Sequence, residues 1–213
     1  MALCSEPVNL EVNLLQPVSI ESSAGGYNLF TERCHSYAWC DNVFEKNELD
    51  TLLNICKSLS FEKGQIASNN QSDEVRNSNV KFLYPNRMTS WIFEKLAGSI
   101  HHMNEEYFGF DLNQIQEGIQ LTRYEAPQQH YVWHLDRSLS LPTRKLSVVV
   151  QLSDPEDYSG GELELMLSDD IETFKKDQGS AIFFPSWTLH RVKPVTQGVR
   201  YSLVCWVSGP PFK

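Results

Sequence analysis

Two segments in the first half of the chain place apolar residues at helical spacing. Because positions three, four and seven apart lie on one face of an α-helix, both segments predict amphipathic helices. They cover residues 47–59, with Leu49, Leu52, Leu53, Cys56 and Leu59, and residues 88–107, with Trp91, Ile92, Leu96, Ile100 and Met103. Residues 61–73 between them are polar and rich in Asn, Ser and Gln, which predicts an exposed loop.

The second half of the chain changes to a period of two. From about residue 116 onward, β-branched and aromatic residues alternate with Gly, Pro and Asp, which is typical of short strands joined by turns. Many short strands favour a closed or double-sheet architecture such as a jelly roll, with the two helices packed outside. The predicted strands are 119–124, 131–135, 145–152, 162–167, 180–184, 188–192 and 199–207.

The chain has 213 residues, which is long enough for one domain around a sizeable core. We expect a single domain over 31–213, in which 40–110 give helical support and 115–211 form the β core. Residues 1–30 show no sustained periodicity, so we expect a loosely attached arm there. The fold class is therefore mainly β with flanking helices, an α+β arrangement.

Charge and composition narrow the classes of function. A formal net charge of -9 repels phosphate backbones, so nucleic acid is a disfavoured partner. No apolar run approaches the roughly 20 residues that span a bilayer, and no basic residue precedes Arg33, so we expect neither a membrane span nor an export signal. Five cysteines without a C-x-x-C spacing favour free thiols in a reducing cytoplasm.

The first candidate for chemistry is His134-Leu135-Asp136 at the end of a predicted strand. Side chains two residues apart on a strand point to the same face, so an imidazole and a carboxylate converge there. Alone this pattern is weak, because chance supplies it often. A strand end with one buried and one solvated polar residue explains it equally well.

Two residues of the later strands strengthen this candidate. His190 lies in an apolar strand, where a lone histidine is more often a satisfied core residue than a ligand. Arg200 lies ten residues further on, on the same strand face as Ser202 and Trp206. Burying an arginine in so apolar a strand costs free energy unless an anion pairs with it, and a carboxylate ligand supplies that partner with bidentate geometry.

Two histidines and one carboxylate form the ligand set of the non-haem Fe(II) oxygenases. With His134, Asp136 and His190 as ligands, three positions of octahedral iron stay open. A 2-oxo acid can chelate two of them and leave the third for O2, while Arg200 holds the distal carboxylate of 2-oxoglutarate. Zinc is the competing metal, but zinc hydrolases do not need a buried arginine at this spacing.

Several linked motifs over residues 76–211 resemble the prolyl 4-hydroxylase-like branch of the 2-oxoglutarate- and Fe(II)-dependent dioxygenases, including bacterial and phage PKHD-type members. Tyr124 and Tyr131 precede His134 by ten and three residues, as in the oxygen-sensing prolyl hydroxylases. Ser159-Gly-Gly-Glu-Leu163 resembles the G-G-x-L strand start of the family. Residues 184–195 followed by 198–204 resemble the PKHD pattern closely.

The resemblance implies a double-stranded β-helix, also called a jelly roll, that uses Fe(II), 2-oxoglutarate and O2, with ascorbate as an auxiliary reductant. It implies that Tyr124 bonds the co-substrate and that Arg200 pairs with its distal carboxylate. Gln151 stands where some prolyl hydroxylases have a second tyrosine contacting that carboxylate. Collagen-type enzymes carry lysine at the position of Arg200, and the nucleic-acid demethylase branch carries another arginine at the position of Trp206, which speaks against both branches.

The reaction implied by the resemblance is oxidative decarboxylation of 2-oxoglutarate to succinate and CO2, coupled to hydroxylation of an unactivated C–H bond. By family analogy the substrate is a prolyl residue in a protein or peptide. Two alternatives stay open: an oxygenase acting on a free amino acid or another small molecule, and a catalytically silent jelly-roll binding module. Trp133, Trp187 and Trp206 are candidates for the wall of the site, although buried aromatics in β proteins are mostly core.

Overall fold

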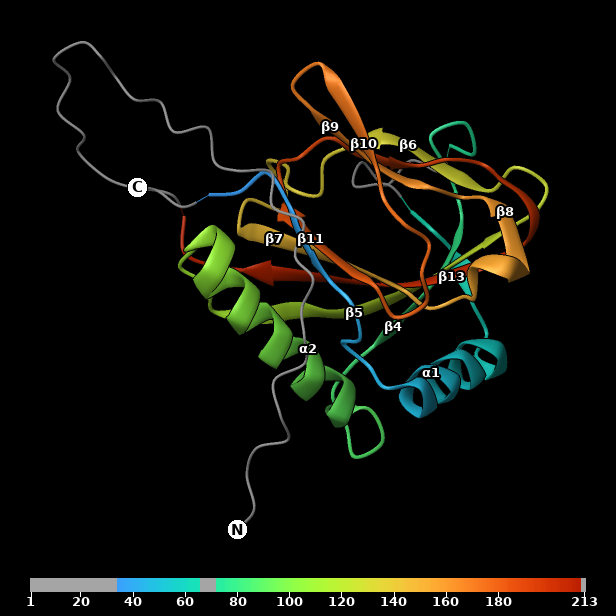
Figure 1. The fold of residues 1–213 in the computed structure, drawn as a ribbon, viewed down its shortest axis with the longest axis horizontal. Coiled ribbons are helices and arrows are strands. Elements are labelled where there is room, and N and C mark those ends of the chain that lie inside the picture. The colour runs from blue at the N-terminus through green and yellow to red at the C-terminus, as the bar shows by residue number, and fades with distance from the viewer. Residues whose placement is uncertain (1–33, 66–71, 212–213) are drawn as a thin grey trace, which may run out of the picture.

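Two antiparallel β-sheets face each other in the computed structural model, which describes residues 34–65 and 72–211 (Figure 1). The arm expected over 1–30 and residues 66–71 of the expected loop lie outside the described residues. The larger sheet contains the long central strands, and the smaller one lies over its inner face (Figure 1). This double-sheet arrangement confirms the jelly roll predicted from the sequence.

The larger sheet runs in the order β1 (Ala38–Cys40), β11 (Ala181–Pro185), β7 (Arg144–Gln151), β13 (Val195–Ser208), β5 (Gln114–Glu125), β4 (Asn79–Leu83) and β2 (Glu62–Lys63), and β8 (Tyr158–Gly160) pairs with β13 beside this path. The smaller sheet runs in the order β10 (Asp170–Thr173), β9 (Leu163–Leu167), β12 (His190–Val192), β6 (His130–His134) and β3 (Arg76–Asn77). A single 3-10 turn, η2 (Pro155–Asp157), precedes β8.

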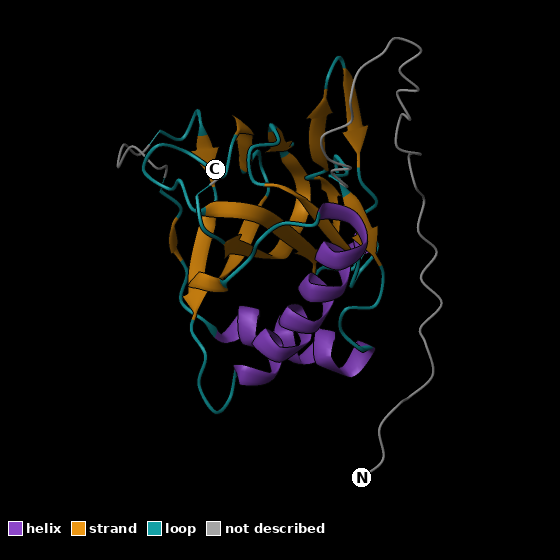
Figure 2. Ribbon diagram, turned by 90° about the vertical axis from the view of Figure 1, so that its left-hand side faces the viewer, coloured by secondary structure: helices purple, strands orange, loops and turns teal. Residues whose placement is uncertain are grey.

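Two helices cover the outer face of the larger sheet (Figure 2). Helix α1 (Lys46–Ser58) begins with a capping box, in which the backbone N–H of Glu45 donates to the Glu48 carboxylate over 2.8 Å. Helix α2 (Ser90–Met103) continues into a π-helical turn, η1 (Asn104–Phe108). Their buried faces are those expected from the spacing: Leu49, Leu52 and Cys56 in α1, and Ile92, Leu96, Ile100 and Met103 in α2.

Alternate residues of the central strands enter two different apolar cores. In β7, Val148 and Val150 pack on the helix side of the larger sheet, whereas Val149 packs between the two sheets. Ile182 and Phe184 of β11 join Val149 between the sheets. All eight residues of β7 are buried, because both of its faces are covered. This double cover explains why its sequence is apolar without a clear alternation.

The strands that the sequence does not predict are β1, β2, β3, β4, β8 and β10. Each has only two to five residues. Length alone does not explain why they were missed, because β6, β9, β11 and β12 are equally short and were predicted from the apolar runs that contain them. Three of the six missed strands, β2, β3 and β4, come from the part of the chain expected to be helical support, which therefore also completes both sheets. Neither α-helix within the described ranges is long and apolar enough to cross a membrane.

Candidate metal centre and co-substrate cavity

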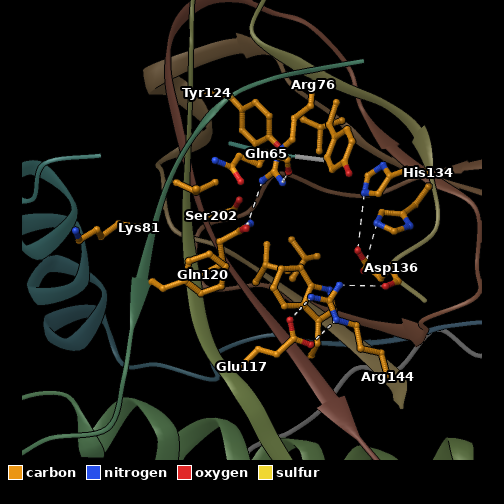
Figure 3. A pocket seen from close by; sticks show the side chains of 18 of the residues that line it. Gln65, Arg76, Lys81, Glu117, Gln120, Tyr124, His134, Asp136, Arg144 and Ser202 are labelled. Carbon is orange, nitrogen blue, oxygen red and sulfur yellow. Dashed lines mark hydrogen bonds and ion pairs between the residues drawn. The ribbon is translucent and has the colours of Figure 1, made fainter. Parts of the chain in front are cut away.

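The ends of β6 and β12 bring three candidate ligands together. His134 closes β6 and lies directly opposite His190, the first residue of β12. Asp136 follows two residues after His134, and its carboxylate oxygens lie 3.9 Å from His134 Nε2 and 3.5 Å from His190 Nε2. The three ligand atoms all lie within 4.8 Å of one another. The structure therefore brings the three predicted metal ligands to one point (Figure 3).

Backbone hydrogen bonds orient both imidazoles for metal binding. His134 Nδ1 lies 2.8 Å from the carbonyl oxygen of Val132, and His190 Nδ1 lies 2.9 Å from that of Thr188. A carbonyl oxygen can only accept, so Nδ1 carries the proton in each ring. Each Nε2 therefore presents a lone pair toward Asp136, as a metal ligand must.

The protonation states of the site suit a cation. Burial, with a smaller contribution from the neighbouring His190, lowers the pKa of His134 to about 3, so its ring is neutral near pH 7. For Asp136, burial raises the pKa, but His190, His134 and the hydrogen bond from Ser147 together lower it below its ordinary value. Two imidazole nitrogens and one carboxylate are the donor set of the Fe(II) facial triad, and they fit that metal.

Two residues of β7 form hydrogen bonds with Asp136. The Ser147 hydroxyl donates to Asp136 Oδ2 over 2.7 Å and lies 2.9 Å from the hydroxyl of Ser186. Arg144 at the start of β7 donates from Nη1 to the backbone carbonyl of Asp136 over 3.0 Å, and its other nitrogens bind the Glu117 carboxylate. These contacts fix the carboxylate group from the side opposite the histidines.

Arg200 lies on β13, lines the same cavity as the triad and is completely buried. Its Nη2 donates to Gln151 Oε1 over 2.8 Å and its Nη1 to Ser202 Oγ over 3.3 Å, while its Nε has no hydrogen-bond partner among the described residues. No carboxylate of the described chain forms an ion pair with it. An uncompensated buried guanidinium is costly, so the distal carboxylate of a dicarboxylate fits this position.

Tyr124 stands beside Arg200 because β5 and β13 pair these two residues directly. The Arg200 guanidinium carbon lies 5.5 Å from the centroid of the Tyr124 ring. Burial raises the pKa of Tyr124 despite the opposing effect of Arg76 and Arg200, so its hydroxyl stays protonated and can donate a hydrogen bond.

The triad, Tyr124 and Arg200 all line one cavity of about 670 Å³ between the two sheets (Figure 3). Gln151, which we expected at the co-substrate, does not line this cavity and reaches it only through its hydrogen bond to Arg200. The expected strand face of β13 is observed, because Ser202, Val204 and Trp206 join Arg200 in the lining.

Of the three tryptophans considered for the cavity wall, one lines the cavity and two do not. Trp206 lines the cavity beneath Arg144, whose guanidinium carbon lies 3.9 Å from the Trp206 ring centroid. Trp133 lies against Arg191, and Trp187 packs on Phe110, and neither lines the cavity.

The sequence did not reveal three residues of this region: Arg76, Arg144 and Ser147. Arg144 directly precedes the predicted strand 145–152, and Ser147 interrupts the apolar run of that strand, so a polar residue within an apolar strand was the available signal. Arg76 offered none, because β3 has only two residues and its place at the cavity depends on pairing with Tyr131 of β6.

Comparison with known proteins agrees with this geometry. Residues 119–208 match the model of the 2OG-Fe(II) oxygenase superfamily. A PKHD-type hydroxylase of Synechococcus sp. (strain JA-2-3B'a(2-13)) is 43% identical over 94 residues, which are 42% of this chain and 42% of that protein. The PKHD-type hydroxylase of Crocosphaera subtropica is 29% identical over 182 residues, 78% of this chain and 76% of that protein. The match to the former thus spans about two fifths of the relative's length.

Solved structures share the fold at low identity. A prolyl hydroxylase from Trichoplax adhaerens, in complex with a hypoxia inducible factor peptide fragment, superposes with a TM-score of 0.70 at 18% identity, covering 81% of this chain and 83% of that one. A Pseudomonas putida prolyl-4-hydroxylase gives a TM-score of 0.69 at 19% identity, covering 82% and 93%. Residues 119–208, most of the jelly-roll core, thus match the 2OG-Fe(II) oxygenase superfamily, and the likeness to PKHD-type hydroxylases predicted from the motifs is confirmed.

Proposed function

We propose that this protein is a 2-oxoglutarate-dependent Fe(II) dioxygenase that hydroxylates an unactivated C–H bond. One observation carries the proposal: a two-histidine, one-carboxylate cluster lines the same cavity as a buried arginine that pairs with no carboxylate of the described residues. The first fits iron and the second fits the distal carboxylate of 2-oxoglutarate. Neither feature is needed for the stability of a jelly roll, and the buried arginine opposes it.

Each residue of the site has a defined task. His134, Asp136 and His190 hold the metal, with the Nδ1 protons of both histidines bound by backbone carbonyls so that each Nε2 faces the metal position. Iron bound there would supply the activation of O2 that is coupled to decarboxylation of 2-oxoglutarate to succinate and CO2. Arg200 pairs with the distal carboxylate, and the Tyr124 hydroxyl donates a hydrogen bond to the co-substrate. Gln151 positions the Arg200 guanidinium from outside the cavity.

The proposed substrate is a prolyl residue in a protein or peptide. The prolyl hydroxylase activity named for the structural neighbours supports this choice by analogy. A second support is the cavity mouth, where Tyr84 and Leu135 line the cavity yet are 61% and 49% exposed. Apolar side chains at an entrance can bind the residues that flank a target in an extended peptide.

Three further parts of the proposal concern the domain organisation, the compartment and the reductant. We propose that residues 31–213 act as one catalytic domain with residues 40–110 as its helical support, that the protein works in the cytoplasm, and that ascorbate serves as an auxiliary reductant. Buried thiols at Cys40, Cys56 and Cys205, none in a disulfide, are compatible with a reducing compartment.

The test uses protein loaded anaerobically with Fe(II), then exposed to O2 and 2-oxoglutarate with and without a panel of Pro-containing peptides. Succinate formation that a peptide stimulates, with a mass gain of one oxygen in that peptide, supports the full proposal. Stimulation by free amino acids alone favours the small-molecule oxygenase. Binding of Fe(II) and 2-oxoglutarate without any succinate supports the silent binding module.

A further inference from the structure

Three arginines of the described chain are buried, and they differ in their partners. Arg144 is 8% exposed and binds the Glu117 carboxylate through two nitrogens. Arg200 has no carboxylate, and the proposed function gives it one from 2-oxoglutarate. Arg76 is also 8% exposed and also has no carboxylate partner among the described residues, yet it lines the same cavity (Figure 3). A second buried positive charge is therefore left without an anion.

The hydrogen bonds of Arg76 leave part of its guanidinium available. Its Nε donates to Ser78 Oγ over 2.9 Å, its Nη1 to the backbone carbonyl of Gln65 over 2.9 Å, and its Nη2 to Gln120 Oε1 over 3.4 Å. A guanidinium has five N–H groups, so one remains on each terminal nitrogen. Two N–H groups on adjacent terminal nitrogens match the two oxygens of a carboxylate.

The position of Arg76 relates this charge to the metal centre. Strand β3 pairs Arg76 with Tyr131 of β6, and the guanidinium carbon lies 4.7 Å from the Tyr131 ring centroid. Tyr131 also stacks on His134, with ring centroids 3.4 Å apart and an interplanar angle of 14°. The Tyr131 ring thus contacts both the Arg76 guanidinium and a metal ligand, which places Arg76 near the metal centre.

No carboxylate of the cavity wall is available to neutralise Arg76. Asp136 belongs to the metal set, Glu117 binds Arg144, and Glu62 is exposed and forms an ion pair with Lys81. No described residue of the wall therefore supplies this anion, whereas a molecule that enters the cavity can supply it.

We propose that Arg76 binds a carboxylate of the prime substrate, next to the carbon that is hydroxylated. The inference rests on the proposed function and narrows its substrate class to acids. The carboxylate is either the α-carboxylate of a free amino or imino acid, or the side chain of an acidic residue adjacent to the target in a peptide. In both cases it occupies a site distinct from that of 2-oxoglutarate at Arg200.

The experiment compares acids with their neutral amides, using Fe(II)-loaded protein, 2-oxoglutarate and O2. One arm takes free amino acids against their amides, beginning with L-proline and L-prolinamide. The other takes acetylated, amidated Gly-Pro-Glu and Glu-Pro-Gly peptides against the matching glutamine peptides. The readout is succinate formed above the rate without substrate, together with oxygen incorporation. The arm that responds identifies the source of the carboxylate.

In wild-type protein we expect stimulation by the acid of a pair and little or none by its amide. Arg76→Gln should lower kcat/KM for the acid by about 10- to 100-fold, the loss typical of a charge-assisted hydrogen-bond pair, and so remove most of the preference for acids. Arg76→Lys keeps the positive charge but loses the paired N–H groups of the guanidinium. Its kcat/KM for the acid should lie between those of the wild type and Arg76→Gln. Arg123→Gln makes the same change at an arginine outside the cavity, which pairs with Glu125, and should keep the acid preference.

Three results would overturn the assignment. Equal stimulation by acid and amide, or by neither, means that no carboxylate is recognised. A rise in the 2-oxoglutarate KM of Arg76→Gln as large as its loss with the acid assigns Arg76 to the co-substrate. Thermal unfolding shows whether each variant is folded. If Arg76→Gln does not fold, the kcat/KM of Arg76→Lys for the acid tests the assignment instead. Failure of the proposed function looks different, because wild-type protein would then make no succinate with any addition.

Discussion

At the scale of single residues, the metal set can be tested without knowing the substrate. His134→Ala, Asp136→Ala or His190→Ala removes one of three ligand atoms that lie within 4.8 Å of one another. Each change should weaken Fe(II) binding and abolish succinate formation from 2-oxoglutarate in the absence of a prime substrate. Fe(II) titration and succinate measurement check this outcome.

The matched control is His101→Ala, because His101 is an exposed histidine on α2, outside the cavity. It should keep wild-type metal affinity and succinate formation. Normal succinate formation in any of the three ligand variants would remove that residue from the metal set.

The Arg200 end of the cavity can be tested with an isosteric substitution. Gln151 accepts a hydrogen bond from Arg200 over 2.8 Å, so Gln151→Glu places a carboxylate on the buried guanidinium within the protein itself. The new ion pair should stabilise the ligand-free fold and compete with the distal carboxylate of 2-oxoglutarate. We expect a higher melting temperature without ligand together with a KM for 2-oxoglutarate raised at least about tenfold.

Steady-state kinetics and thermal unfolding measure the two effects of Gln151→Glu. Gln151→Met is its matched control, since it has a similar length and adds no charge. A Gln151→Glu protein with unaltered KM for 2-oxoglutarate would argue that the co-substrate does not use Arg200.

At the scale of elements, the turn before β9 constrains the position of Arg200. Gly161 has a φ of +67°, and a Cβ there would lie 2.9 Å from Val195 Cγ2 and 3.0 Å from Arg200 Cδ. Gly161→Ala should therefore cost about 1–2 kcal/mol of unfolding free energy and displace Arg200, raising the KM for 2-oxoglutarate. Urea unfolding and steady-state kinetics measure the two effects.

Gly98 of α2 provides the contrasting substitution. A Cβ there meets nothing within 4 Å, and the residue lies inside a helix. Gly98→Ala should stabilise the fold by about 0.5–1 kcal/mol and leave the KM for 2-oxoglutarate as it is in the wild type. Loss of stability in Gly98→Ala and none in Gly161→Ala would contradict this account of the two glycines.

The sequence predicts the helices and strands whose own residues carry a pattern of apolar positions. Helices α1 and α2 and all seven expected strands are present, because each buries one face or two against a large neighbour. The short strands depend on pairing partners far away in the sequence. Strand β3 is the clearest case: Arg76 reaches the cavity only because β3 is held at the edge of β6 by two residue pairs.

At the scale of the whole molecule, the site exists only when both sheets have formed. The smaller sheet contributes His134 and His190, whereas β5 and β13 of the larger sheet contribute Tyr124 and Arg200. Motif spacing predicted that the triad and Arg200 share one site, and in the structure all four residues line one cavity. The relative placement of the two sheets, and with it the identity of the cavity wall, required the folded chain.

This division of the site between two sheets makes ligand binding a global stabiliser. A ligand that joins the metal to Arg200 spans both sheets and also pairs the buried guanidinium. Ligand at about 100 times its Kd adds about 2.7 kcal/mol to the free energy of unfolding, and each kcal/mol shifts the melting temperature of a domain this size by roughly 2–4 °C. We therefore expect Mn(II), as an inert substitute for Fe(II), and 2-oxoglutarate together to raise the melting temperature by roughly 5–10 °C.

The same melting experiment distinguishes the contribution of metal chelation from that of the distal carboxylate. With Mn(II) present, 2-oxobutyrate can chelate the metal but lacks the distal carboxylate, so its shift should be much smaller than that of 2-oxoglutarate. In Arg200→Leu the two compounds should give similar, small shifts, because the partner of that carboxylate is gone, whereas metal alone should still stabilise the protein. If 2-oxobutyrate stabilises the wild-type protein as strongly as 2-oxoglutarate, the distal carboxylate is unbound, and Arg200 needs another anion.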